Sequence, residues 1–188
     1  MKIKQVLFFD INLQNSFIRK LLYPAILGSL IYDLTKFEVN NEFLLMIITI
    51  IFYIIDDLYM TYVLEDYQPC KEANNKKLKG SMVLVDFIVA ALFMGIIYSI
   101  HKSNYFLILS CSVAIFILAL FYFENTRTSL AIFLSLIITS IILLVVNILL
   151  VEYCKCNVKE VTDWIYSLMV FLYAVAVSID YYIDKKSI

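Results

Sequence analysis

The sequence predicts an all-α integral membrane protein, a bundle of about six transmembrane helices with both termini in the cytoplasm. Of its 188 residues, 63% are hydrophobic and 16% are charged, whereas soluble domains average about half apolar and a quarter charged residues. Its uncharged stretches are also long: residues 128–151 contain no charged side chain, and about 18 apolar residues suffice to cross a bilayer. We therefore expect very little of the chain to fold outside a membrane.

Six apolar segments give the expected spans, and together they form a single domain over residues 1–188. They cover residues 17–34, 43–64, 81–100, 104–123, 129–151 and 161–183, with short connections except for a loop at 65–80. The first segment is the weakest, because its uncharged core crosses the bilayer only if Arg19, Lys20 and Asp33 reach the two interfaces. The alternative is a bundle of four or five spans with a re-entrant or interfacial first helix.

The orientation follows from the basic residues, which favour the cytoplasmic side of a membrane. With six spans, the side of both termini would hold Lys2, Lys4, Arg19, Lys20, Lys71, Lys76, Lys77, Lys79, Arg127, Lys185 and Lys186. The opposite side would hold only Lys36, Lys102, Lys155 and Lys159. If the first segment did not cross, the amino-terminal basic residues would change sides and the asymmetry would vanish. The distribution therefore favours six spans.

Charged residues near the cytoplasmic ends of the spans are the candidates for function, because a charge in hydrocarbon costs at least about 2.5 kcal/mol unless it is paired or hydrated. Helix geometry brings several to one depth, in a predicted polar layer of Asp56, Asp57, Asp86, Glu124, Arg127 and Asp180. The layer could bind a cation or proton, line a substrate vestibule, or dock a protein. In the alternative interpretation these side chains only reach the headgroups or pair with one another.

Three classes of function are compatible with these features. The first is a non-enzymatic, homo-oligomeric membrane subunit that senses a membrane event and docks a cytoplasmic protein through the predicted loop, with Glu65, Asp66, Lys76, Lys77 and Lys79 as candidate contacts. The second is a channel or carrier for a small solute or ion, such as a vitamin-binding transport subunit. The third, a lipid-modifying enzyme, lacks acids repeated one helical turn apart to hold magnesium and diphosphate. We expect no catalytic residue, cofactor or metal ion, and no direct binding of nucleic acid.

The acidic stretch FYIIDDLYMTYVLEDY at residues 52–67, the chain length and the multi-span plan resemble small membrane subunits of bacterial antiphage defence systems, Kiwa among them. The resemblance implies a homo-oligomer in the bacterial inner membrane that senses membrane disturbance by a phage and recruits a soluble effector. Asp56, Asp57 and the loop at 65–80 would then be the region of contact. Such subunits have fewer spans, which makes the first and last segments the points of difference.

Overall fold

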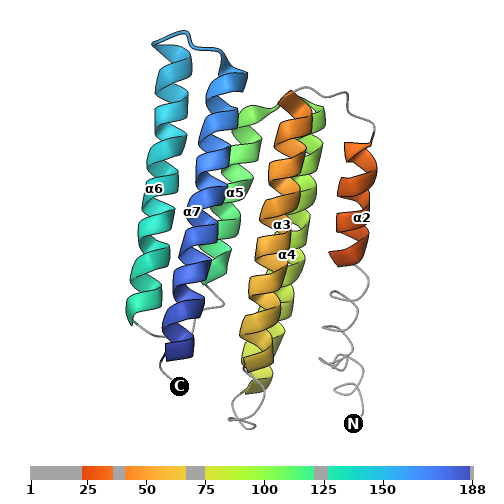
Figure 1. Ribbon diagram of the computed structural model, residues 1–188, viewed down its shortest axis with the longest axis vertical. Helices are drawn as coiled ribbons and strands as arrows, with labels where there is room; N and C mark the ends of the chain where they lie inside the picture. Colours follow the sequence, from red (N-terminus) through yellow and green to blue (C-terminus); the bar gives the residue numbers. More distant parts are fainter. Residues whose placement is uncertain (1–22, 36–40, 67–74, 121–126, 187–188) are drawn as a thin grey trace, which may run out of the picture.

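The computed structural model describes residues 23–35, 41–66, 75–120 and 127–186, and all of its regular structure there is α-helical. The helices are α2 (Tyr23–Leu34), α3 (Asn41–Asp66), α4 (Asn75–His101), α5 (Tyr105–Ala119), α6 (Arg127–Glu152) and α7 (Val158–Lys186). Each corresponds to one apolar segment of the sequence, so the all-helical class is confirmed. Consecutive helices alternate in direction, and α2 begins at the same end of the bundle at which α7 ends (Figure 1).

Three of the described helices are long and apolar enough to cross a membrane: Leu84–His101 in α4, Leu130–Glu152 in α6 and Val158–Ile183 in α7. Helix α3 is as long as these, but Glu42, Asp56 and Asp57 interrupt its apolar sequence. The described parts of α2 and α5 are shorter, with 12 and 15 residues. At 1.5 Å per residue they extend only about 18 and 22 Å, less than a hydrocarbon core of about 30 Å.

The connection between α3 and α4 is shorter than predicted. Helix α3 continues to Asp66 and α4 begins at Asn75, so Lys76, Lys77 and Lys79 belong to the start of a helix instead of a loop. Lysine and glutamate are good helix formers, and charge alone does not end a helix. Hydropathy locates the apolar centre of a helix but underestimates its polar ends.

The bundle has a centre of four helices and two flanking helices. Helix α3 packs against α4 and α7, and α5 packs against α4 and α7, which together enclose the core. Helix α2 covers α3 and α4 on one side, whereas α6 covers α5 and α7 on the opposite side (Figure 1). The site described below lies between α2, α3, α4 and α7.

One aromatic ring from each central helix meets in the core. The ring of Phe52 in α3 lies 5.0 Å from Phe93 in α4, 5.6 Å from Phe116 in α5 and 5.2 Å from Tyr173 in α7, measured between centroids. Phe116 and Tyr173 stack at 5.1 Å. These edge and stacked arrangements contribute about 0.5–1.5 kcal/mol per pair beyond burial. The four rings fix the spacing of the helices at this level.

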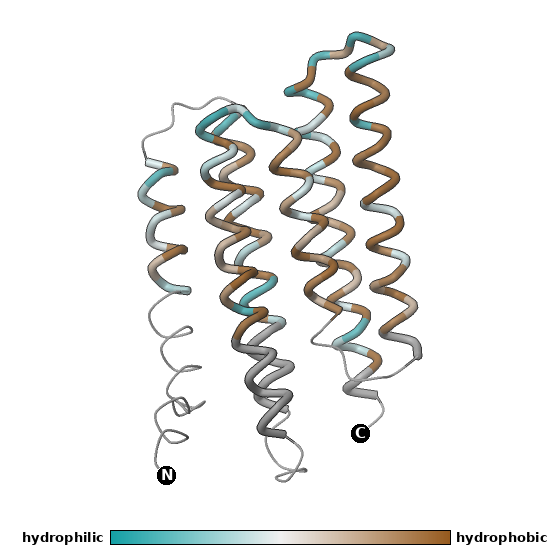
Figure 2. Tube along the Cα trace, turned by 180° about the vertical axis from the view of Figure 1, so that it is seen from behind, coloured by the Kyte–Doolittle hydropathy of each residue, from teal (hydrophilic) through white to brown (hydrophobic). Residues whose placement is uncertain are grey.

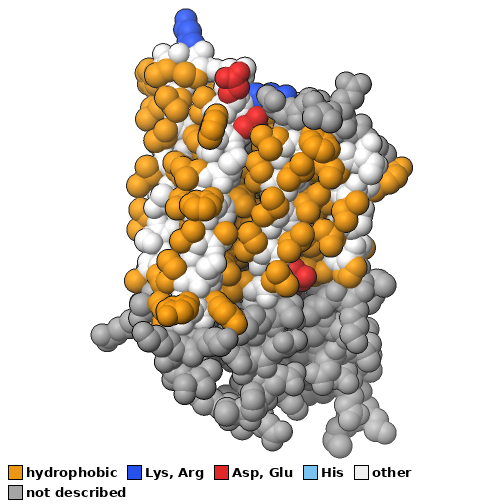
Figure 3. Space-filling view, in the orientation of Figure 1, with side chains coloured by type: hydrophobic (Ala, Val, Ile, Leu, Met, Phe, Trp, Pro, Cys, Tyr) orange, Lys and Arg blue, Asp and Glu red, His pale blue; other side chains and the backbone are white. Residues whose placement is uncertain are grey.

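The described part of the face in Figure 3 is largely apolar along the helices, with charged side chains gathered at the upper turns, and the helices in Figure 2 are mostly hydrophobic along their length. Helix α6 shows this most clearly, since it exposes a row of large aliphatic side chains, Leu134, Ile138, Ile141, Ile142, Val145 and Leu149. Patches of this size are rare on soluble monomers. The surface is suited to contact with lipid.

Two tight turns join helices at the end opposite to Tyr23 and Lys186. In the α4–α5 turn, Ser103 has φ 51°, and the Asn104 side chain caps α5 by accepting the backbone N–H of Leu107 at 3.3 Å. In the α6–α7 turn, Lys155 has φ 50°, and Asn157 accepts the N–H of Lys159 at 3.1 Å. A residue in the left-handed region is strained unless it is glycine.

Replacing Ser103 with glycine should stabilise the protein. The left-handed conformation costs a non-glycine residue about 1–2 kcal/mol, and the greater freedom of glycine in the unfolded chain returns part of that. We expect the free energy of unfolding of Ser103→Gly to rise by about 0.5–1 kcal/mol, measured by denaturation in mixed detergent micelles. Lys102→Gly, one residue earlier and outside the left-handed region, should lower it. A loss of stability in Ser103→Gly would contradict this account of the turn.

Candidate functional site

Helices α3 and α7 run in the same direction and are joined by polar pairs at seven-residue steps. Thr49 and Tyr166 share a hydrogen bond between their hydroxyls at 2.9 Å. Seven residues further along each helix, the Tyr173 hydroxyl donates to Oδ1 of Asp56 at 2.5 Å. Seven residues make two turns of an α-helix, so the pairs repeat on matching faces and hold the two helices in register.

The Asp56 carboxylate lies inside the bundle. The residue is only 3% exposed, and while Oδ1 accepts from Tyr173, Oδ2 has no hydrogen-bond partner among the described residues. Asp86, on the neighbouring α4, is 2% exposed, and its charge lies within electrostatic range of Asp56. The site therefore places two carboxyl groups close together, with one oxygen of Asp56 open.

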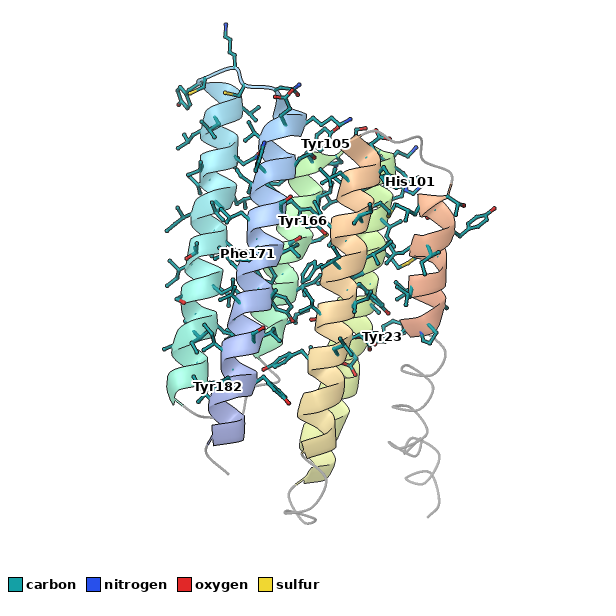
Figure 4. All side chains as sticks on the ribbon, viewed as in Figure 1. Tyr23, His101, Tyr105, Tyr166, Phe171 and Tyr182 are labelled. Carbon is teal, nitrogen blue, oxygen red and sulfur yellow. The ribbon has the colours of Figure 1, made fainter. Side chains whose placement is uncertain are left out.

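Two tyrosines close the site on the side of α2. The Tyr53 hydroxyl donates to the backbone carbonyl of Tyr23 at 2.9 Å, and the two rings lie 5.4 Å apart. The hydroxyl of Tyr23 has no partner among the described residues, although the residue is 3% exposed and lies within electrostatic range of Asp56 and Asp86. Figure 4 shows Tyr23 at the start of the described α2, beside α3. We call Tyr23, Tyr53, Asp56, Asp86 and Tyr173 the acid–tyrosine cluster.

Asp180 belongs to a separate level of the bundle. It is buried, and Oδ2 accepts the hydroxyl of Tyr59 at 2.7 Å. Asp180 lies two turns beyond Tyr173 in α7, towards the end of the helix, and Asp57 is partly buried beside Asp56. The predicted polar layer is thus divided into the acid–tyrosine cluster and a lower Tyr59–Asp180 pair.

Other predicted site residues lie outside the described side chains: Glu124, Arg127, Glu65, Asp66, Lys76, Lys77 and Lys79. The basic side chains that the structure describes are His101, Lys102, Lys155 and Lys159. All four lie in or next to the two turns at the end away from the cluster, where His101 (Figure 4) approaches Asp33 to 4.0 Å.

A second polar contact, which the sequence analysis did not select, joins α6 and α7 near those turns. The Asn147 side chain donates to Oγ1 of Thr162 at 3.1 Å, and both residues are buried. Asp163, next to Thr162, is also buried, and its Oδ1 has no partner among the described atoms. This group lies near a helix end and contains one carboxylate, so it is a weaker candidate for a functional site than the acid–tyrosine cluster.

The tyrosines are the part of the site that the sequence analysis missed. A signal was present: Tyr166, Tyr173 and Asp180 follow one another at seven-residue intervals, as do Thr49 and Asp56. Polar residues at that spacing occupy one helix face. Matching the two series would have predicted the α3–α7 contact.

Chemically, the cluster offers acidic oxygens and aromatic faces. Carboxylates and phenol oxygens bind protons and small cations, and aromatic faces attract cations as well. Within the described residues, no group of three or more His, Cys, Asp or Glu side chains could hold a metal ion.

Comparison with known proteins provides no relative from which a function could be transferred. No protein-family model matches the chain, and neither a curated protein nor a solved structure shows significant similarity.

Removing the hydroxyl that holds Asp56 should destabilise the bundle. Tyr173→Phe keeps the ring in the aromatic core but leaves Oδ1 of Asp56 without its donor, which costs about 1–3 kcal/mol for a buried acceptor. Tyr182→Phe, on an exposed tyrosine of the same helix, should change the free energy of unfolding by less than about 0.5 kcal/mol. In a double-mutant cycle, Tyr173→Phe and Asp56→Leu should be coupled by about 1–3 kcal/mol; additive effects would show that the bond is not energetically significant.

Proposed function

We propose that the chain is a six-span membrane protein whose acid–tyrosine cluster takes up a cation inside the bundle. This corresponds to the channel or carrier class of the sequence analysis. The observation that carries the proposal is Oδ2 of Asp56, which is buried within electrostatic range of Asp86 and of the Tyr23 hydroxyl, and which, like that hydroxyl, has no hydrogen-bond partner among the described residues.

The aromatic residues of α7 support a transmembrane arrangement. Trp164 is 79% exposed and Tyr182 is 67% exposed, and the surface between them is formed by Leu168, Phe171 and other apolar side chains (Figure 4). The 18-residue separation corresponds to about 27 Å, close to a hydrocarbon thickness of about 30 Å. Tryptophan and tyrosine concentrate at the two interfaces of a membrane, which is the pattern expected if α7 spans it.

The depth of the cluster favours a functional role. On α7, Tyr173 lies nine residues from Trp164 and nine from Tyr182, so in this arrangement its bond to Asp56 lies near the middle of the bilayer. A carboxyl group at this depth cannot reach the headgroups, unlike Asp180 near the helix end. Ionisable groups inside a membrane typically mark ion or substrate pathways. The interpretation as a headgroup contact therefore suits Asp180 better than Asp56.

The docking-subunit hypothesis remains a prediction. Its proposed contacts at Glu65, Asp66, Lys76, Lys77 and Lys79 lie outside the described side chains, and the homo-oligomer, the cytoplasmic partner and the role in antiphage defence stay predictions with it. A cation-dependent membrane subunit would combine both hypotheses, since Asp56 and Asp86 of the cluster lie on α3 and α4, the two helices that the α3–α4 connection joins.

The native cysteines test one requirement of the six-span topology, an odd number of crossings between the α3–α4 connection and the α6–α7 turn, together with the orientation in a bacterial inner membrane. Cys154 and Cys156 are exposed in the α6–α7 turn and Cys111 is buried in α5, whereas Cys70 lies in the connection between α3 and α4. A membrane-impermeant maleimide added to intact spheroplasts should label wild type and Cys70→Ser. It should label Cys154→Ser/Cys156→Ser only after lysis.

The cysteine experiment separates the alternatives. If only Cys70 is labelled in intact spheroplasts, the protein has the opposite orientation in the membrane. The six-span topology places an odd number of crossings between Cys70 and the cysteines of the α6–α7 turn. Labelling of both Cys70 and that turn in intact spheroplasts would place them on the same side of the membrane, and the six-span topology would fail.

Cation uptake should stabilise the folded protein. We expect Na⁺, K⁺ or tetramethylammonium, each exchanged for N-methylglucamine at constant ionic strength, to raise the thermal unfolding midpoint of the purified protein. A ligand at 100 times its Kd contributes about 2.7 kcal/mol. Asp56→Asn keeps a side-chain oxygen for Tyr173 but removes the charge, and it should abolish the shift.

The matched control is Glu152→Gln, because Glu152 is exposed at the end of α6. This variant should respond to cations as wild type does. If none of the three cations stabilises wild type, or if Asp56→Asn responds equally, the cluster does not bind a cation and the proposed function is wrong.

A further inference from the structure

An apolar groove opens between α2 and α4, directly beside the acid–tyrosine cluster. Its volume is about 310 Å³, and its lining includes Ala25 and Ser29 of α2 together with Phe87, Ala91 and Met94 of α4. A volume of this order lies at the lower end of the range for small-molecule sites, about 300–1,000 Å³. The groove is therefore large enough for a ring or a short apolar chain.

Small side chains create this groove. Ala25, Ser29 and Ala91 carry at most two heavy atoms beyond the backbone, and a Cβ added to Gly28 would meet no atom within 4 Å. Helix α2 contacts α3 and α4 but none of the other helices to a comparable extent. The groove thus results from the small residues at which α2 packs on α4, and it does not depend on the rotamer of any one side chain.

The inner end of the groove lies about one helical turn from the cluster on each of its two helices. Ala90, which lines the groove, lies four residues after Asp86 on the same face of α4, and Ile26 lies three residues after Tyr23 on the same face of α2. Both groove residues are buried. A molecule lying in the groove would therefore point one end at Tyr23 and Asp86.

The chemistry along this path changes from apolar to acidic. The groove lining is almost entirely apolar, whereas the adjoining cluster presents two carboxyl groups and the rings of Tyr23 and Tyr53. Aromatic rings beside a carboxylate are suited to alkylammonium groups, which bind rings through cation–π attraction. The Tyr23 hydroxyl and Asp56 Oδ2 have no hydrogen-bond partner among the described residues, both residues are more than nine-tenths buried, and they lie within electrostatic range of each other.

We propose that the α2–α4 groove and the acid–tyrosine cluster together bind an organic cation, with its ammonium group at Asp86 and Asp56 and its apolar body in the groove. This inference rests on the proposed uptake of a cation and names the class of ligand. An ammonium ion that carries a ring or short chain satisfies both parts of the site, whereas an inorganic cation satisfies only the cluster.

The test compares two probes that share a headgroup. Tetramethylammonium reaches only the cluster, and benzyltrimethylammonium adds one ring for the groove. We expect benzyltrimethylammonium to bind the purified protein about tenfold or more tightly, since burial of one ring from water has an effect of that order. Isothermal titration calorimetry measures both affinities.

Filling the groove should remove only this difference. Ala91→Phe adds a ring at an exposed groove position, and it should reduce the affinity for benzyltrimethylammonium to that of tetramethylammonium while leaving the latter unchanged. Ala131→Phe makes the same change at an exposed position of α6, away from α2 and α4, and should retain the tenfold difference.

The outcomes are distinct. Equal affinity of wild type for both probes, or an unchanged preference in Ala91→Phe, would overturn the organic-cation site while leaving uptake of a small cation intact. Binding of neither probe would count against both proposals. Equal binding of neopentylbenzene, the uncharged isostere of benzyltrimethylammonium, would show that the groove accepts any apolar molecule, including a lipid chain, and would also overturn it.

Discussion

The hydrogen bond from Tyr173 to Asp56 is the interaction on which the arrangement of the central helices depends. It joins two residues that are 117 positions apart in the chain, and it fixes the hydroxyl end of a ring whose other faces pack on Phe52 and Phe116. In a medium without water, a buried carboxyl group must find its partners within the protein. The polar bond and the aromatic core therefore specify the same register, and neither can shift without the other.

The sequence was sufficient to predict the helices but not the detailed site. Uncharged length determines where a span can lie, so all six apolar segments are recovered as helices. Asp56, Asp86 and Asp180 were predicted to lie at one depth in the membrane. Counting residues along a helix gives only the position along the helix axis and does not give the direction of the side chain. Which face each carboxylate presents depends on the neighbouring helices: α7 provides Tyr173 for Asp56, whereas α3 provides Tyr59 for Asp180. That pairing requires α3 and α7 to be parallel neighbours, a property of the topology that hydropathy does not contain.

The two sides of the acid–tyrosine cluster are held differently. On the α7 side, bonds at Thr49 and Asp56 repeat every seven residues and are reinforced by ring packing. On the α2 side, the described contact is a bond from Tyr53 to a backbone carbonyl, beside a groove that small residues leave open. One wall is thus fixed by side-chain complementarity, whereas on the other side the described part of α2 packs mainly against α3 and α4. Access from the bilayer would be expected on the α2 side.

The carboxylate of Asp56 is held in one orientation, although only one of its two oxygens has a described hydrogen bond. Tyr173 binds one oxygen and so fixes the orientation of the group, but the second oxygen has no hydrogen-bond partner among the described residues, while Tyr23 and Asp86 lie within electrostatic range of Asp56. A purely structural pair would be more stable with both oxygens bonded, because an unsatisfied buried polar atom costs about 1–3 kcal/mol. A ligand that binds a group already held in position loses less conformational entropy than one that must order it. An oriented but incompletely bonded carboxylate therefore supports the proposed cation site over a purely structural contact between helices.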